Sequence, residues 1–260
     1  AEIQYLDYLM FALQTLSDDL ATVSYRSVGK QLAPLIVRTR GHRLEGMWHA
    51  GSPMGMILNS LKGMLVLTPR NMVQAAGMYN TLLSCSDPAL IIEPLNAYRL
   101  KEKEPNNIGE FNVPLGHVEY ISKGKDITVV SYGSTLKLVE KAIVELLKHD
   151  IEIELIDLQT LIPIDINMDI VKSLEKTNKL LIIDEDFPGG ASSHIMKVVL
   201  EDHDGFKFLD SKPVTLTAME HRPPYGSDGD YFSKPSIDDI FESCYKIMHE
   251  YSPKKYPLKF

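Results

Sequence analysis

The sequence predicts an α/β fold made of two domains, each with a mainly parallel sheet. Three observations predict it. Apolar, β-branched runs alternate with amphipathic helical segments throughout the second half, the first hundred residues repeat this alternation with a different spacing, and a charged, proline-containing stretch at 94–109 separates the two. Because parallel strands need a crossover connection, alternating strands and helices favour a sheet covered by helices on both faces. We expect domains at residues 1–108, which include the linker, and 109–260.

The first domain is predicted to begin with a helix of about 20 residues from Tyr5, because its apolar side chains recur at helical spacing. A long loop, residues 40–55, follows the first predicted strand and contains Trp48, the only tryptophan, and two histidines, His42 and His49. Ligands of open α/β sheets bind beyond the carboxyl ends of strands, so we expect functional groups in this loop. The other predicted elements of this domain are strands at 35–39, 64–67 and 89–92 and a helix at 72–83.

In the second domain, apolar runs typical of strands alternate clearly with apolar residues at helical spacing. Residues 127–132 form a continuous β-branched run, typical of a strand buried on both faces, and Gly133-Ser134-Thr135 then offers a turn and a helix N-cap. The next helix carries apolar residues at helical spacing, at Leu136, Val139, Ile143, Leu146 and Leu147. Further strands are predicted at 151–156, 180–183 and 214–219, and further helices at 166–174, 192–200 and 237–248.

Composition narrows the class of protein. Of 260 residues, 44% are hydrophobic and 24% charged, which is typical of a soluble globular protein. The net charge of −8 argues against a nucleic-acid or membrane surface, so a small-molecule or protein partner is expected. Cys85 and Cys244 lie far apart, which indicates reduced thiols and a cytoplasmic location rather than a disulfide framework or zinc site. No apolar run approaches the roughly 20 residues of a membrane span.

The most specific motif is Asp157-Leu158-Gln159-Thr160-Leu161-Ile162-Pro163-Ile164-Asp165, interpreted as a strand, a polar turn and a helix that starts after the proline. It closely resembles the Asp-Leu-Arg-Thr-Leu-x-Pro-x-Asp run of the beta subunits of 2-oxo acid dehydrogenase decarboxylating components. These are thiamine diphosphate enzymes of the transketolase superfamily. The resemblance extends over essentially the whole chain, with further matches at Thr68-Pro69-Arg70, Glu93-Pro94 and Tyr98-Arg99.

This resemblance implies a particular division of the fold. Residues 1–108 would be the later half of a three-layer pyrimidine-binding domain, and residues 109–260 a complete transketolase-type carboxy-terminal α/β domain. The glutamate that activates the cofactor in this family would precede Ala1, so we expect an incomplete chain that is inactive alone. Thiamine diphosphate would be shared with an absent domain, and magnesium would be held outside this chain.

The resemblance also implies a catalytic histidine. Trp48-His49-Ala50-Gly51-Ser52-Pro53-Met54 aligns without a gap on the Tyr-His-Ser-Gln-Ser-Pro-Glu run of the family. His49 would then handle protons and place the substrate or acyl acceptor, a task that suits an imidazole near neutral pH. Three flanking residues differ from the family's, so the hydrogen bonds that orient the ring do not carry over. His42 is interpreted as an ordinary loop histidine.

The opening residues, Ala1-Glu2-Ile3-Gln4-Tyr5-Leu6-Asp7-Tyr8, resemble the Ala-Glu-Ile-Gln-Phe-x-Asp-Tyr junction of the family. By this match Gln4 lines the cofactor pocket and Tyr8 stacks on the aminopyrimidine ring. The spacing alone favours a different interpretation, in which Tyr5, Tyr8 and Phe11 form an apolar stripe on a helix.

No metal ligand is predicted in this chain. Asp184, Glu185 and Asp186 end a predicted buried strand and are interpreted as solvated carboxylates rather than a metal site. Gly189-Gly190 follows them and is interpreted as a tight turn, because no phosphate-binding glycine motif accompanies it.

The predicted function is part of a 2-oxo acid dehydrogenase, an oxidoreductase that decarboxylates a 2-oxo acid and passes the acyl group to a lipoyl arm. The loop around His49 resembles the branched-chain version (3-methyl-2-oxobutanoate type) more than others. The alternatives are a pyruvate dehydrogenase beta subunit, a transketolase-like sugar enzyme and a non-catalytic docking module of a multienzyme complex. Expected partners are an alpha subunit or fused amino-terminal half, a lipoyl-bearing acyltransferase and a second copy of this chain. The first domain contains several methionines close together, which would either make dimer contacts or pack in the core: Met47, Met54, Met56 and Met64.

Overall fold

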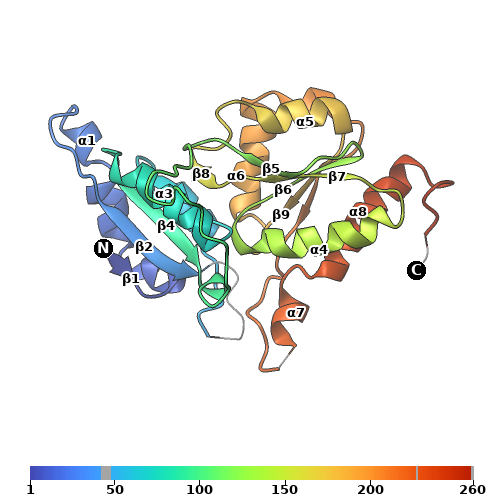
Figure 1. The fold of residues 1–260 in the computed structure, drawn as a ribbon, viewed down its shortest axis with the longest axis horizontal. Coiled ribbons are helices and arrows are strands. Elements are labelled where there is room, and N and C mark those ends of the chain that lie inside the picture. Colours follow the sequence, from blue (N-terminus) through green and yellow to red (C-terminus); the bar gives the residue numbers. More distant parts are fainter. Residues whose placement is uncertain (42–47, 227, 259–260) are drawn as a thin grey trace.

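The computed structural model describes residues 1–41, 48–226 and 228–258, and two five-stranded sheets lie side by side in it (Figure 1). The strand orders are β1-β2-β4-β3-β8 in the first sheet and β10-β9-β6-β7-β5 in the second. Pairing is parallel in both sheets except at one edge of each. In the first sheet β8 runs antiparallel to β3, and in the second β5 runs antiparallel to β7. The predicted α/β class with mainly parallel sheets is therefore confirmed. In the described ranges no helix has the length and apolarity to cross a membrane.

The first sheet is built on β4, whose six residues are all buried and pair with a strand on each side. A strand buried on both faces needs an unbroken apolar run, and Ala89 to Ile92 supplies it. The strands are β1 (Glu2–Ile3), β2 (Ile36–Gly41), β3 (Leu65–Leu67), β4 (Ala89–Pro94) and β8 (Thr160–Ile162), and the longer helices are α2 (Met54–Ser60) and α3 (Met72–Leu83).

The predicted 20-residue first helix is not regular. The chain instead forms a 3₁₀ helix at Leu6–Phe11, a π-helix at Thr15–Leu20 and α1 at Val23–Arg26. Leu6 and Leu9 are both completely buried. Their three-residue spacing matches the 3₁₀ period of three residues per turn, so tertiary burial explains why this turn tightens.

The second sheet separates two helical layers (Figure 1). Val129 of β6 packs in one core cluster with α4 and α8, whereas the next residue, Val130, packs in another with α5 and α6. The elements are β5 (Glu119–Ser122), β6 (Ile127–Ser131), β7 (Ile153–Asp157), β9 (Leu180–Ile183), β10 (Val214–Leu216), α4 (Leu136–Leu147), α5 (Asp169–Thr177), α6 (Ala191–Lys197), α7 (Gly229–Ser233) and α8 (Ile237–Tyr251).

The signature motif joins the two halves. Residues Thr160–Ile162 form β8 and pair with β3 of the first sheet, so the expected helix start after Pro163 is displaced to Asp169. Asp165 then caps this helix, because its carboxylate accepts the backbone N–H groups of Asp169 and Ile170, each at 2.8 Å. The domain boundary between 108 and 109 stays a prediction. The strand β8 comes after this boundary in the sequence but belongs to the first sheet.

A buried ionic network, which we call the Arg70 network, lies beside this junction. The Arg70 guanidinium donates to Glu119 at 2.6 Å and to Asp157 at 2.8 Å. The Gln74 amide donates to Asp157 at 3.0 Å and to the Gln159 side-chain oxygen at 2.7 Å. Asp157 is fully buried, and burial raises its pKa although Arg70 and Gln74 oppose that shift. The network therefore ties the end of β3 to β5 and β7 of the second sheet.

We expect Arg70→Met to lower the free energy of unfolding by about 3–5 kcal/mol, because it leaves the buried Asp157 carboxylate without its counter-ion. Urea unfolding followed by circular dichroism measures this. Lys125→Met, which breaks an exposed pair with Glu152, is the control and should cost at most about 1 kcal/mol. The double variant with Asp157→Asn should recover part of the loss. Equal losses for Arg70→Met and Lys125→Met would contradict the assigned role.

Candidate functional site

Four side chains meet at the carboxyl ends of β1 and β2. The His49 ring stacks flat on the Tyr5 ring, with centroids 4.1 Å apart and planes at 2°, and meets the Tyr8 ring edge-on at 4.9 Å. His49 Nδ1 lies 3.2 and 3.3 Å from the two Asp7 carboxylate oxygens, and Nε2 lies 3.5 Å from the Tyr8 hydroxyl. The structure therefore holds the histidine by a carboxylate on one side and an aromatic wall on the other.

This arrangement selects one tautomer of His49. An ionised carboxylate only accepts hydrogen bonds, so Nδ1 carries the proton that Asp7 accepts. In the neutral ring Nε2 is then an acceptor, facing the Tyr8 hydroxyl. His49 also has a φ of 58°, a left-handed conformation that is uncommon outside glycine and often found where a side chain is placed for function. The geometry gives Nε2 a fixed direction and a lone pair.

The sequence predicted that His49 and Tyr8 belong to this cluster, and it did not predict Asp7. Asp7 lies 42 residues before His49 in the sequence, so no local pattern around the histidine indicates it. The available signal was the acid within the opening octamer match, directly before Tyr8. His42 lies outside the described residues.

The stripe interpretation of the first helix is not supported. Phe11 is 92% exposed and Tyr8 40% exposed, while Leu6 and Leu9 fill the core instead. The Tyr8 ring therefore has a face available to a ligand. Gln4 has an exposed side chain, and its backbone carbonyl accepts the Arg40 Nε–H at 3.0 Å.

Arg40 connects Gln4 to the stacked rings. Its guanidinium carbon lies 5.2 Å from the centre of the Tyr5 ring, within the range of a cation–π contact. Gln4, Tyr8 and His49 thus occupy one end of the first sheet, as the sequence predicted, although no direct contact joins the Gln4 side chain to the other two. Their roles stay a prediction.

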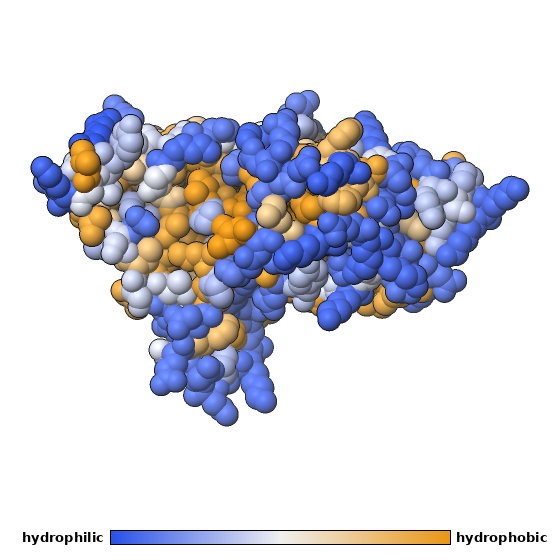
Figure 2. All heavy atoms as spheres, turned by 90° about the horizontal axis from the view of Figure 1, so that it is seen from above, coloured by the Kyte–Doolittle hydropathy of each residue, from blue (hydrophilic) through white to orange (hydrophobic). Residues whose placement is uncertain are grey.

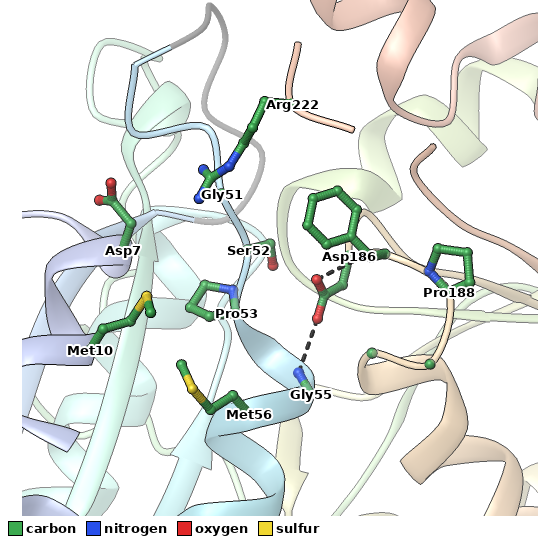
Figure 3. Close-up of a pocket in the computed structure, with 13 residues that line it drawn as sticks. Asp7, Met10, Gly51, Ser52, Pro53, Gly55, Met56, Asp186, Pro188 and Arg222 are labelled. Atoms are coloured by element: carbon green, nitrogen blue, oxygen red, sulfur yellow. Dashed lines mark hydrogen bonds between the residues drawn. The ribbon is translucent and has the colours of Figure 1, made fainter. Parts of the chain in front are cut away.

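A pocket of about 320 Å³ opens on the far side of Asp7, between the two halves of the chain (Figure 3). The loop before α2 lines one side, and the turn between β9 and α6 lines the other. Asp186 Oδ2 accepts the Gly55 N–H at 3.0 Å and so bridges the pocket floor. The predicted turn at Gly189-Gly190 is present, with φ of 87° at Gly189. The lining residues are Asp7, Met10, Gly51, Ser52, Pro53, Gly55, Met56, Asp186, Phe187, Pro188, Gly189, Gly190 and Arg222.

The carboxylates that end β9 are not solvated, so that interpretation is wrong. Asp184, Glu185 and Asp186 are all at most 6% exposed, because the first half of the chain covers this end of the second sheet. Asp184 accepts the Tyr132 hydroxyl at 2.6 Å, and Glu185 lies 3.7 Å from the Lys234 ammonium. Within the described ranges no group of three or more histidine, cysteine or acidic side chains gathers in a way that suits a metal ion.

Gly55 and Gly190 lie where neighbouring atoms leave little room for a side chain. A Cβ on Gly55 would lie 3.0 Å from the Gly190 Cα, and a Cβ on Gly190 would lie 2.4 Å from an Asp186 oxygen. Burial is the main cause that raises the pKa of Asp186 from 3.8 to about 6, with Asp184 and Glu185 adding repulsion. Met54 and Met64 are core residues, which supports the packing interpretation for those two methionines, while Met47 lies outside the described residues.

The raised pKa of Asp186 predicts that the stability of the fold depends on pH. Its folded-state pKa is raised, so the folded chain binds a proton more tightly than the unfolded chain, and stability falls as pH rises from about 4 to about 6. Asp186→Asn removes this contribution. The unfolding free energy of the wild type relative to this variant should therefore decrease by on the order of 2 kcal/mol between pH 4 and pH 7.

Urea unfolding at several pH values measures this difference, with Asp18→Asn on the surface as the control for the substitution itself. A difference between wild type and Asp186→Asn that does not vary with pH would contradict the assignment.

Comparisons with known proteins agree with this architecture. Residues 116–234 match the family model of the transketolase C-terminal domain. The chain is 28% identical over 243 residues to the pyruvate dehydrogenase E1 component subunit beta of Acholeplasma laidlawii, covering 92% of this chain and 72% of that protein. It is 29% identical over 258 residues to the mitochondrial 2-oxoisovalerate dehydrogenase subunit beta of Chaetomium thermophilum, covering 95% of this chain and 52% of that protein.

A solved structure described as a split gene transketolase, inactive beta4 tetramer, shares the fold. The TM-score is 0.73 at 16% identity, over 95% of this chain and 75% of the other. Residues 116–234 thus belong to the transketolase C-terminal domain family, and almost the whole chain is similar to beta subunits of 2-oxo acid dehydrogenases.

Proposed function

We propose that this chain supplies part of a thiamine diphosphate-dependent 2-oxo acid dehydrogenase, with His49 as its catalytic residue. The observation that carries the proposal is the fixed direction of His49 Nε2, set by Asp7 and the stacked Tyr5 ring. The relatives of this chain include beta subunits that act in both pyruvate and 2-oxoisovalerate dehydrogenases. We favour the branched-chain substrate because of the loop around His49, with pyruvate as the alternative.

The residues at the end of the first sheet fit the pyrimidine side of the cofactor. Tyr8 offers an exposed aromatic face for stacking, and the Gln4 side chain is free to reach a ring nitrogen or amine. Thiamine diphosphate, when bound, supplies the nucleophilic carbon and the electron sink for decarboxylation. In this proposal His49 Nε2 accepts or returns a proton at the substrate oxygen or the acceptor thiol, and Asp7 stabilises the imidazolium that results.

The remaining groups are proposed to come from other protein. The chain spans 52% to 72% of the length of the two relatives, which are named as subunits, so we propose an alpha subunit or fused amino-terminal half as partner. Magnesium and the diphosphate would bind there. In the completed reaction the substrate loses carbon dioxide, its oxo carbon is oxidised to the acyl level, and the disulfide of a lipoyl-bearing acyltransferase is reduced to a thioester and a thiol.

Activity in the presence and absence of the partner tests the proposal. With thiamine diphosphate, magnesium and 3-methyl-2-oxobutanoate, the chain alone should give no turnover, and addition of the alpha-type subunit from the same organism should restore it. Dye reduction measures the rate. Within the complex, His49→Gln should lower the rate about 100- to 10,000-fold, which is the usual contribution of a positioned acid or base.

The variants separate a catalytic from a structural role. His117→Gln is the matched control and should keep the wild-type rate, because the partner of its side chain is Asn167, away from His49. Asp7→Asn presents an amide that donates to Nδ1 and so reverses the tautomer of His49, and it should lower kcat more than it changes KM. Turnover by the chain alone, or full activity of His49→Gln in the complex, would refute the proposal.

The surface of the first half supports proposed protein partners. Apolar side chains gather in the part of the face in Figure 2 that holds the first half of the chain, whereas the second half is mostly hydrophilic. Large exposed apolar areas often mark protein interfaces. Among the described residues before residue 50, the large exposed hydrophobic ones are Tyr8, Met10, Phe11, Tyr25, Val28, Leu32, Leu35 and Trp48.

We propose that the chain forms a homodimer through this half. Sedimentation equilibrium should show a dimer, and Phe11→Asp, which adds charge to a fully projecting side chain without touching the core, should shift the equilibrium to monomer. Val144→Asp on the exposed face of α4 is the matched control and should leave the dimer intact. A monomer at every concentration would exclude the homodimer.

A further inference from the structure

The pocket beyond Asp7 has apolar walls with polar groups at one end (Figure 3). Met10, Pro53 and Met56 line it from the first half of the chain, and Phe187 and Pro188 line it from the second. Its volume of about 320 Å³ lies at the small end of ligand pockets, which run from about 300 to 1,000 Å³. Walls of this kind favour a short hydrocarbon body.

The two carboxylates that border the pocket already accept hydrogen bonds. Both Asp7 oxygens face His49 Nδ1. The Asp186 oxygens accept the backbone N–H groups of Gly55 at 3.0 Å and Phe187 at 2.8 Å. These acids are therefore engaged in holding the protein together, and their role toward a ligand is to repel additional negative charge.

The pocket also contains hydrogen-bond donors that no described side chain uses. Arg222 makes no ion pair with any described residue, and its guanidinium lies against Gly51, where a Cβ would come within 2.3 Å of Nη1. Ser52 is only 8% exposed, and its hydroxyl has no hydrogen-bond partner in the described part of the protein. Figure 3 shows this hydroxyl on the side of the pocket that faces Asp186. A buried hydroxyl without a partner costs about 1–3 kcal/mol, so a ligand that meets it gains affinity.

We propose that this interdomain pocket binds a small aliphatic monocarboxylate. The planar guanidinium of Arg222 matches a carboxylate through two parallel hydrogen bonds, and the Ser52 hydroxyl supplies a further donor. Met10 and Met56 adapt to the hydrocarbon chain. Asp7 and Asp186 disfavour a second negative charge, so the site selects monocarboxylates over dicarboxylates and phosphates. Because Asp7 also holds His49, an occupant of this pocket touches the residue that orients the proposed catalytic group.

Methionine methyl NMR tests the site directly. The whole chain, labelled with methyl-¹³C methionine and free of thiamine diphosphate, is titrated with 3-methylbutanoate. The Met10 and Met56 signals, assigned with Met→Leu variants, should shift with saturation, and the exposed Met168 signal should not. The 2-oxo counterpart, 3-methyl-2-oxobutanoate, should bind with similar affinity, because the site recognises the carboxylate and the chain. Butanedioate should bind at least tenfold more weakly.

Two variants test the donors. Arg222→Gln and Ser52→Ala should each weaken binding, Arg222→Gln by at least tenfold, while Arg26→Gln, an exposed arginine of α1, should bind like the wild type. Unchanged circular dichroism spectra and Met78 signals establish that each variant is folded. Wild-type affinity of Arg222→Gln, absence of shifts at Met10 and Met56, or a response to the 2-oxo acid alone would each overturn the proposal. Since the titration contains no cofactor or partner, its result is independent of the proposed dehydrogenase function.

Discussion

The salt bridge from Arg70 to the buried Asp157 carboxylate is the constraint on which the rest of the structure depends. It places the end of β3 against β7, and β8 follows Asp157 by only a few residues before joining the first sheet. A charge buried this deeply is tolerated only with its partner in place. The two sheets are consequently held in one relative position, and so is every group that lies between them.

The core enforces the same position by packing. One apolar cluster runs from Leu6 and Leu9 of the first half to Val130 and Ile156 of the second. A close-packed protein interior transmits the displacement of one segment to its neighbours rather than absorbing it. Asp186 in the second half therefore accepts a hydrogen bond from the Gly55 N–H in the first half, although the two residues are 131 positions apart in the sequence. The described segment 48–53, which carries His49, leads directly into this junction.

Much of the fold was readable from the sequence, and the failures have physical causes. The run from Ile127 and the spacing from Leu136 to Leu147 identified β6 and α4 closely, because burial on two faces and one-face amphipathicity leave clear periods. Short elements such as β8 and the 3₁₀ turn at Leu6 were missed, since pairing with a distant strand and tertiary burial, not local pattern, create them. The contact of Asp7 with His49 and the burial of Asp186 were not predicted, for the same reason. Both depend on what the chain brings next to them.

The origin of β8 has a consequence for how this protein can be divided. Cutting the chain between residues 108 and 109 would remove the outer strand of the first sheet and leave β3 with a bare row of backbone groups. Such an uncapped edge pairs readily with other chains. Recombination or gene splitting at that point would thus yield an amino-terminal product that aggregates. Modular exchange within this fold must keep the signature strand with the segment it covers.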